Sequence, residues 1–237
     1  MNKKMTTLAA AVLMTASPLA ISTAAADVTL SGNVALTTDY VYRGISQTDS
    51  GAAIQGGFDL AHSSGFYAGV WASNLDFGDD ADIEIDYYAG FGGEFSNKIG
   101  YDVGVIYYAY PDSKAADTGD YDFTEVYGSL SYDFGPAAVT GGVAYSSDFF
   151  GSTGDATYVS VGVDIPLAND FALGLHYGDQ SIDDGTDYND WKIGVSKSWS
   201  GFDFALDYTD TDLSDRNDCG NANICDDRII FTVSKSL

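Results

Sequence analysis

Twelve segments of the chain alternate apolar and polar residues with a period of two, the pattern of β-strands whose two faces meet different surroundings. In one of them, Ile83, Ile85 and Tyr87 alternate with Glu84 and Asp86. The pattern predicts strands at residues 28–38, 52–60, 66–73, 83–94, 99–109, 123–132, 137–145, 157–165, 171–177, 190–197, 202–208 and 228–237. Most of these lengths suit the roughly 9–11 residues of a tilted membrane-spanning strand, and a few are shorter.

The connections between the predicted strands alternate between short and long. Short ones cover residues 61–65, 95–99, 133–136, 166–170 and 198–201, and long ones cover 39–51, 74–82, 110–122, 146–156, 178–190 and 209–227. Such alternation, with an even number of strands, is typical of bacterial outer-membrane barrels, whose short turns lie on the periplasmic side. We therefore expect an all-β fold, an antiparallel transmembrane β-barrel of about twelve strands, with both ends of the chain on the periplasmic side.

The acidic residues test this interpretation independently. Of the 35 acids, 23 lie in the six long connections. Those on strands take the parity opposite the apolar positions, as a barrel in lipid requires, because a charge facing lipid is costly. They are Asp27, Asp59, Glu84, Asp86, Glu94, Asp102, Glu125, Asp164, Asp203 and Asp207. A soluble antiparallel barrel or sandwich would also alternate but would bury its apolar face. Here the opposite rows hold Gly, Ser, Thr, Tyr and Asp, which favours a hydrated lumen.

The first 26 residues have the layout of a cleaved secretory signal. Lys3 and Lys4 precede an apolar stretch from Leu8 to Ala20, and small residues end at Ala26 before Asp27. The stretch is too short for a spanning helix, and nowhere later do 18 apolar residues run consecutively. We expect a signal peptide at residues 1–26 and one outer-membrane barrel domain at residues 27–237.

Composition and the C-terminus agree with a barrel. The chain contains 27 Gly, 17 Tyr and 13 Phe but only 4 Pro, which suits strands with aromatic girdles. Ile229, Phe231, Val233 and Leu237 form an apolar row in the last strand, which Lys235 interrupts. The formal net charge of −25 excludes nucleic acid as a partner.

The lumen is where we expect function. Parity places these candidate pore-lining residues there: Asp59, Glu84, Asp86, Glu94, Asp102, Glu125, Asp164, His176, Lys192, Asp203 and Asp207. A lumen lined mainly by acids favours cations, and a twelve-stranded bore is narrow. The Asp-rich loops, such as residues 79–82 and 183–187, match no calcium-loop motif and are expected to hold divalent cations loosely.

Cys219 and Cys225 lie six residues apart in the last predicted loop, and in an oxidising compartment we expect them to form a local disulfide. Its removal should loosen only that loop, because the ring is short. Two thiols without a nearby His do not make a metal site. His62 and His176 have no accompanying nucleophile motif, so we expect no enzymatic activity, metal or organic cofactor.

The segment of residues 37–48, followed by residues 53–59, resembles the N-terminal signature of the TorF family of outer-membrane porins. The resemblance implies an outer-membrane barrel with a role in transport. Its most specific part is a first-loop motif made of Asp39, Tyr40, Tyr42, Arg43, Gly44, Ser46 and Gln47. Arg43 could pair with Asp39 to pin the loop or project into the pore, and the structural role is the interpretation that we favour.

These observations together predict a passive channel in the outer membrane for small hydrophilic solutes that are neutral or cationic. The expected partners are lipid, lipopolysaccharide and the solutes. The alternative is a non-conducting surface barrel whose acidic loops serve adhesion or packing with lipopolysaccharide.

Overall fold

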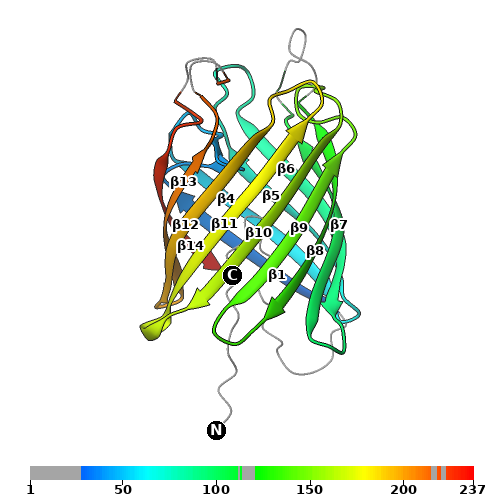
Figure 1. Ribbon diagram of the computed structural model, residues 1–237, viewed down its shortest axis with the longest axis vertical. Helices are drawn as coiled ribbons and strands as arrows, with labels where there is room; N and C mark the ends of the chain where they lie inside the picture. The colour runs from blue at the N-terminus through cyan, green and yellow to red at the C-terminus, as the bar shows by residue number, and fades with distance from the viewer. Residues whose placement is uncertain (1–27, 112, 114–120, 215–217, 220–222) are drawn as a thin grey trace.

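In the computed structural model, twelve antiparallel strands close into a single barrel (Figure 1). The structure describes residues 28–111, 113, 121–214, 218–219 and 223–237, so the expected signal peptide and Asp27 lie outside the described residues. The barrel strands are β1 (Val28–Thr37), β4 (Ala53–His62), β5 (Phe66–Asn74), β6 (Ile83–Glu94), β7 (Ile99–Ala109), β8 (Phe123–Asp133), β9 (Ala138–Ser146), β10 (Ala156–Pro166), β11 (Phe171–Ile182), β12 (Tyr188–Trp199), β13 (Phe202–Thr211) and β14 (Arg228–Ser236). Successive barrel strands pair, and β1 closes the barrel by pairing with β14 as well as β4.

All twelve predicted strands are present, and several reach further than the alternation predicts, among them β11, β12 and β13. Strand β11 continues to Ile182, β12 begins at Tyr188, and β13 ends at Thr211. At this end of the barrel the outward face also carries polar residues, so the apolar alternation stops while backbone pairing continues. The loop expected at residues 178–190 is therefore only a short turn beyond two long strands.

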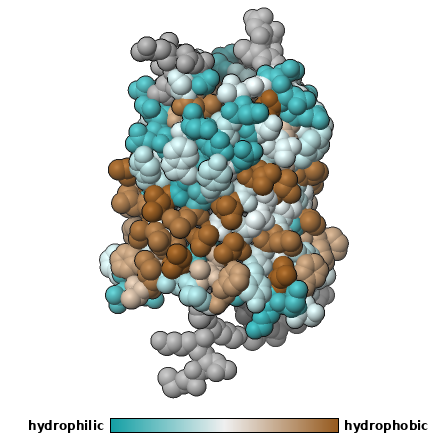
Figure 2. All heavy atoms as spheres, in the orientation of Figure 1, coloured by the Kyte–Doolittle hydropathy of each residue, from teal (hydrophilic) through white to brown (hydrophobic). Residues whose placement is uncertain are grey.

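An apolar belt surrounds the barrel, as predicted (Figure 2). Exposed residues on three of its rows include Val28, Leu30, Val34, Leu36, Val159, Val161, Phe202 and Leu206. Glu84, Asp86 and Glu125 are by contrast buried inside. This is the reverse of a soluble barrel or sandwich, so the apolar face meets lipid and the barrel is of the outer-membrane type.

Aromatic residues flank the belt. Toward the long loops, the exposed Tyr107 and Tyr145 donate hydroxyl hydrogen bonds to Asp122 (2.6 Å) and Asp155 (2.9 Å). Toward the short turns, Phe95, Phe134 and Trp199 are exposed. Aromatic rings are enriched at the two edges of the hydrocarbon layer, where Tyr and Trp also place a polar group at the level of the headgroups.

One short 3₁₀ segment, η1 (Ala168–Asp170), lies in the turn between β10 and β11. Among the described residues, no helix has the length and apolar character needed to cross a membrane.

The first long loop contains a small hairpin of β2 (Val41–Tyr42) and β3 (Ile45–Ser46), which no periodic pattern predicts. Its turn residues Arg43 and Gly44 both have positive φ, 46° and 82°. Positive φ at both central residues is typical of the tight turns that suit hairpin twist. Glycine is also required at position 44 by space, since a Cβ there would collide with the side chain of Thr211.

Candidate functional site: a hairpin in the lumen

The tip of the hairpin crosses the lumen and is fixed to the wall by Arg43, which is buried. The Arg43 Nη2 donates to Glu125 Oε2 on β8 (2.8 Å), and Nη1 donates to Gln180 Oε1 on β11 (2.7 Å). The guanidinium carbon also lies 4.6 Å from the ring centre of Tyr42 and 4.1 Å from that of Tyr158. An ion pair with these hydrogen bonds and two aromatic faces holds the tip in one place.

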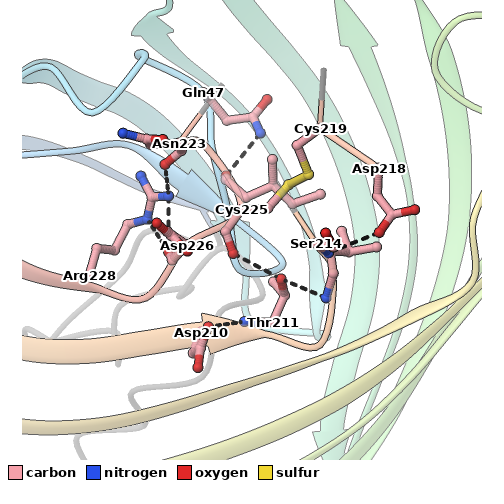
Figure 3. The surroundings of a disulfide bond; sticks show 12 residues. Gln47, Asp210, Thr211, Ser214, Asp218, Cys219, Asn223, Cys225, Asp226 and Arg228 are labelled. Carbon is pink, nitrogen blue, oxygen red and sulfur yellow. Dashed lines mark hydrogen bonds between the residues drawn. A yellow bond between two sulfur atoms is a disulfide. The ribbon is translucent and has the colours of Figure 1, made fainter. Parts of the chain in front are cut away.

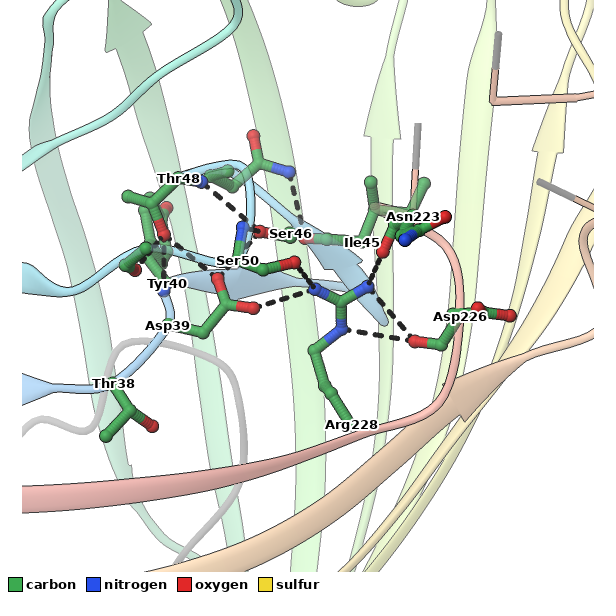
Figure 4. Close-up of polar contacts among 12 residues, drawn as sticks. Thr38, Asp39, Tyr40, Ile45, Ser46, Thr48, Ser50, Asn223, Asp226 and Arg228 are labelled. Carbon is green, nitrogen blue, oxygen red and sulfur yellow. Dashed lines mark hydrogen bonds and ion pairs between the residues drawn. The ribbon is translucent and has the colours of Figure 1, made fainter. Parts of the chain in front are cut away.

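The expected pairing of Arg43 with Asp39 is wrong, and Arg43 instead projects into the lumen. Asp39 Oδ2 accepts a hydrogen bond from Arg228 Nη1 on β14 (2.7 Å), and its Oδ1 accepts from Ser46 Oγ (2.7 Å) and Thr48 Oγ1 (2.9 Å) (Figure 4). Asp39 lies at the base of the hairpin and Arg43 at its tip, so closeness in sequence does not bring them together. The base is thus anchored separately from the tip.

Two tyrosines of the motif connect the hairpin to acids of the wall. Tyr40 donates to Glu84 Oε1 (2.7 Å), and Tyr42 donates to Glu125 Oε2 (3.4 Å). Tyr108, on β7, donates to the same Glu125 oxygen (3.2 Å). Burial, followed by the negative charge of Glu84, raises the pKa of Tyr40 well above its ordinary value, so its hydroxyl stays protonated and donates.

The remaining motif residues bind the hairpin to its surroundings. The backbone N–H of Gln47 donates a hydrogen bond to Tyr40 O (2.7 Å). The backbone N–H of Asp76, in the second long loop, donates one to Gln47 O (2.8 Å). Ser46 N donates to Ile224 O of the last loop (2.8 Å). Every residue of the first-loop motif therefore belongs to one folded element inside the barrel mouth.

Asp86 differs from the other acids near the hairpin. Its side chain is 0% exposed, and neither carboxylate oxygen has a hydrogen-bond partner. Its register partners on the neighbouring strands are Trp71 and Tyr108. Glu84, Asp86 and Glu125 together carry three acidic groups, against the single guanidinium of Arg43.

A second polar cluster lies on the β10 to β12 wall. His176 Nε2 lies 3.3 Å from Asp190 Oδ1, and Tyr158 bonds to both residues at 2.8 Å. Lys192 is the register partner of His176. The sequence prediction placed His176 and Lys192 in the lumen but missed Tyr158, Gln180 and Asp190, although each has the inward parity of its strand.

Nearer the short turns, tyrosine hydroxyls bind the predicted acids. Tyr67 donates to Asp102 (2.8 Å) and shares a 2.6 Å hydrogen bond with Tyr127, while Tyr88 bonds to Asp59. Four predicted pore-lining acids belong to none of these clusters and lie elsewhere on the wall. Asp164 is buried, Asp207 is half-buried beside Gly194, Asp203 accepts from Ser198, and Glu94 is exposed at the end of β6.

The predicted disulfide is present between Cys219 and Cys225, in the last long loop (Figure 3). Cys225 O accepts from Thr211 Oγ1 (3.0 Å), and the adjacent Ile224 O holds the hairpin through Ser46. The loop is thus attached to both the barrel rim and the hairpin. Within the described part of the chain, no three His, Cys, Asp or Glu side chains are grouped to hold a metal ion, and His62 bonds only locally, to Ser64.

The fold is that of outer-membrane porins. KdgM porin in complex with disordered oligogalacturonate has a TM-score of 0.61 at 9% identity, covering 87% of this chain and 99% of that one. NanC porin has a TM-score of 0.52 at 9% identity, with 87% and 98% covered. At these identities the likeness concerns the fold. No curated protein matches the chain in sequence.

The chain belongs to the family described as a bacterial protein of unknown function (Gcw_chp), which matches residues 21–237.

Proposed function

We propose that this protein is a passive outer-membrane channel for small hydrophilic solutes that are neutral or cationic. The observation that carries the proposal is the lumen hairpin, which narrows the bore beside Glu84, Asp86 and Glu125 with Arg43 as the opposing charge. A cluster of acids beside a constriction attracts cations by its field, and the low-dielectric wall strengthens that field. The hairpin limits the size of the solute, and the acids set its charge.

The charge of the chain separates it from a channel for acidic sugars. The KdgM complex contains oligogalacturonate, a chain of acidic sugar units. A protein with a formal net charge of −25 and acids in its lumen repels such a polyanion. We therefore propose the same barrel architecture with the opposite charge preference.

Several finer assignments belong to the same proposal. The first-loop signature supports placing the chain with the TorF family of porins. Residues 1–26 would be removed on export, leaving the barrel domain at residues 27–237. Outer-membrane lipid and lipopolysaccharide would surround the belt, and divalent cations would associate loosely with the acidic loops. We propose no enzymatic role and no cofactor.

Planar-bilayer recording of the purified protein tests this function. In a salt gradient we expect discrete conductance steps and a reversal potential whose sign indicates a preference for cations. A reversal potential of the opposite sign would refute the charge preference.

The competing function is a non-conducting surface barrel, which the burial of the hairpin tip favours. Silent insertion, with correct folding shown by heat-modifiable migration on a gel, would establish that alternative.

A further inference from the structure

Asp86 is a buried acid for which the described residues supply no hydrogen-bond partner. The carboxylate is fully buried, and both of its oxygens lack a partner. Burying a charge is costly unless an opposite charge or hydrogen bonds compensate. Since buried polar groups are almost always satisfied, such a carboxylate indicates a partner that is not a protein side chain.

Among the residues that the structure describes, the groups packed around Asp86 supply no cation. Its strand contributes Glu84 two residues away, and the neighbouring strands contribute Trp71 and Tyr108 at the same height. The hairpin contributes Tyr40, whose ring packs edge-on against Trp71 at 5.4 Å between centroids and whose hydroxyl is bonded to Glu84. Arg43 is the base that the hairpin carries, but its donors are directed to Glu125 and Gln180.

We propose that Asp86, together with Glu84, binds a dehydrated monovalent cation, an alkali-metal ion or ammonium, beneath the hairpin. One carboxylate without a partner and a second two residues away on the same strand offer oxygen ligands to a cation. Trp71 and Tyr108, aromatic residues of the kind that attract cations, are the register partners of Asp86 on the neighbouring strands. The cluster of three His, Cys, Asp or Glu ligands that a structural divalent site would use is absent from the described residues.

The proposal deepens the proposed function, on which it rests, because the site lies on the lumen wall at the constriction. A bound cation there would be a resting position for permeating ions. Conductance would then saturate with salt concentration instead of rising in proportion to it.

Crystallography with thallium(I), a heavy monovalent cation, tests the site without requiring conduction. We expect an anomalous peak in contact with the Asp86 carboxylate in crystals of the unmodified protein grown in a thallium(I) salt. Excess potassium should displace it. In Asp86→Asn, which keeps the shape and removes the charge, the peak should be lost.

Asp59→Asn is the matched control, because Asp59 is also a lumen acid but is bonded by Tyr88. It should keep the peak at Asp86. Absence of the peak in the unmodified protein, or its persistence in Asp86→Asn, would overturn the proposal. If Asp86→Asn does not fold, crystals of the unmodified protein decide the question alone. A thallium peak at another position, or no thallium peak, would refute the site at Asp86.

The two proposals fail separately. A thallium peak at Asp86 in a protein that never conducts would keep the cation site and refute the channel. Cation-selective conductance without the peak would keep the channel and refute the site.

Discussion

Arg228 Nη1 lies 2.7 Å from Asp39 Oδ2, so the first residue of the last barrel strand holds the base of the hairpin that began in the first loop. Both side chains are largely shielded from solvent. This pair at the base and Arg43 at the tip attach the hairpin to the barrel wall at both of its ends. Release of the tip and release of the base should therefore affect the channel differently.

Replacing Arg43 by Ala should release the tip. Glu125 would lose its ionic partner while still buried, and removing one member of a buried pair typically costs about 3–5 kcal/mol. We expect larger and noisier single-channel conductance with stronger cation preference, because the Arg43 guanidinium is gone from the constriction. Lys98→Ala, in a short turn at the opposite rim, is the control and should behave as the unmodified protein. Unchanged conductance in Arg43→Ala would contradict a constriction set by the hairpin.

The ion pair between Asp39 and Arg228, at the base of the hairpin, is suited to a double-mutant cycle. We expect Asp39→Ala and Arg228→Ala each to lower the free energy of unfolding in urea. Their combination should cost less than the sum, with a coupling of about 1–3 kcal/mol as for contacting residues in one network. Additive effects would show that the two residues act independently. The cycle also separates the base from the tip, since both variants keep Arg43.

The disulfide should influence the hairpin as well as its own loop, which revises the sequence-based expectation that only the loop would loosen. Ile224, next to Cys225, accepts a hydrogen bond from Ser46 N of β3. In the double variant with Cys219→Ser and Cys225→Ser, we expect more frequent current fluctuations. The unfolding midpoint in urea should shift little, because a short ring restrains little of the unfolded chain. Reducing agent should reproduce the effect in the unmodified protein. Current noise that reduction leaves unaltered would show that the loop does not steady the hairpin.

The sequence predicts the barrel well because lipid and lumen act on every strand. Ile83 to Glu94 alternates over its whole length, so the pattern is visible without any partner. The hairpin is hidden because β2 and β3 are two residues each, too short for a period to appear. Its contacts join residues far apart in sequence: Arg43 to Gln180, and Asp39 to Arg228. Parity places Gln180 on the lumen face but does not say which loop will reach it.

Charge selectivity should depend on the constriction and hardly on the loops. At physiological salt, exposed charges are screened beyond ~8 Å, whereas charges in a narrow lumen are screened less. Neutralising Glu84, Asp86 and Glu125 together, to Gln, Asn and Gln, leaves Arg43 as the charged side chain of that network. We therefore expect cation preference to be lost and the reversal potential to move toward anion preference.

Neutralising Asp183, Asp184 and Asp187, which are exposed at the turn after β11, changes the same number of acidic side chains and is the matched control. We expect its reversal potential to stay close to that of the unmodified protein, with only the conductance at low salt reduced, because rim charges concentrate cations without discriminating in the bore. If the loop variant lost as much selectivity as the lumen variant, the selective field would lie at the mouth, and the constriction formed by the hairpin would limit only the size of the solute.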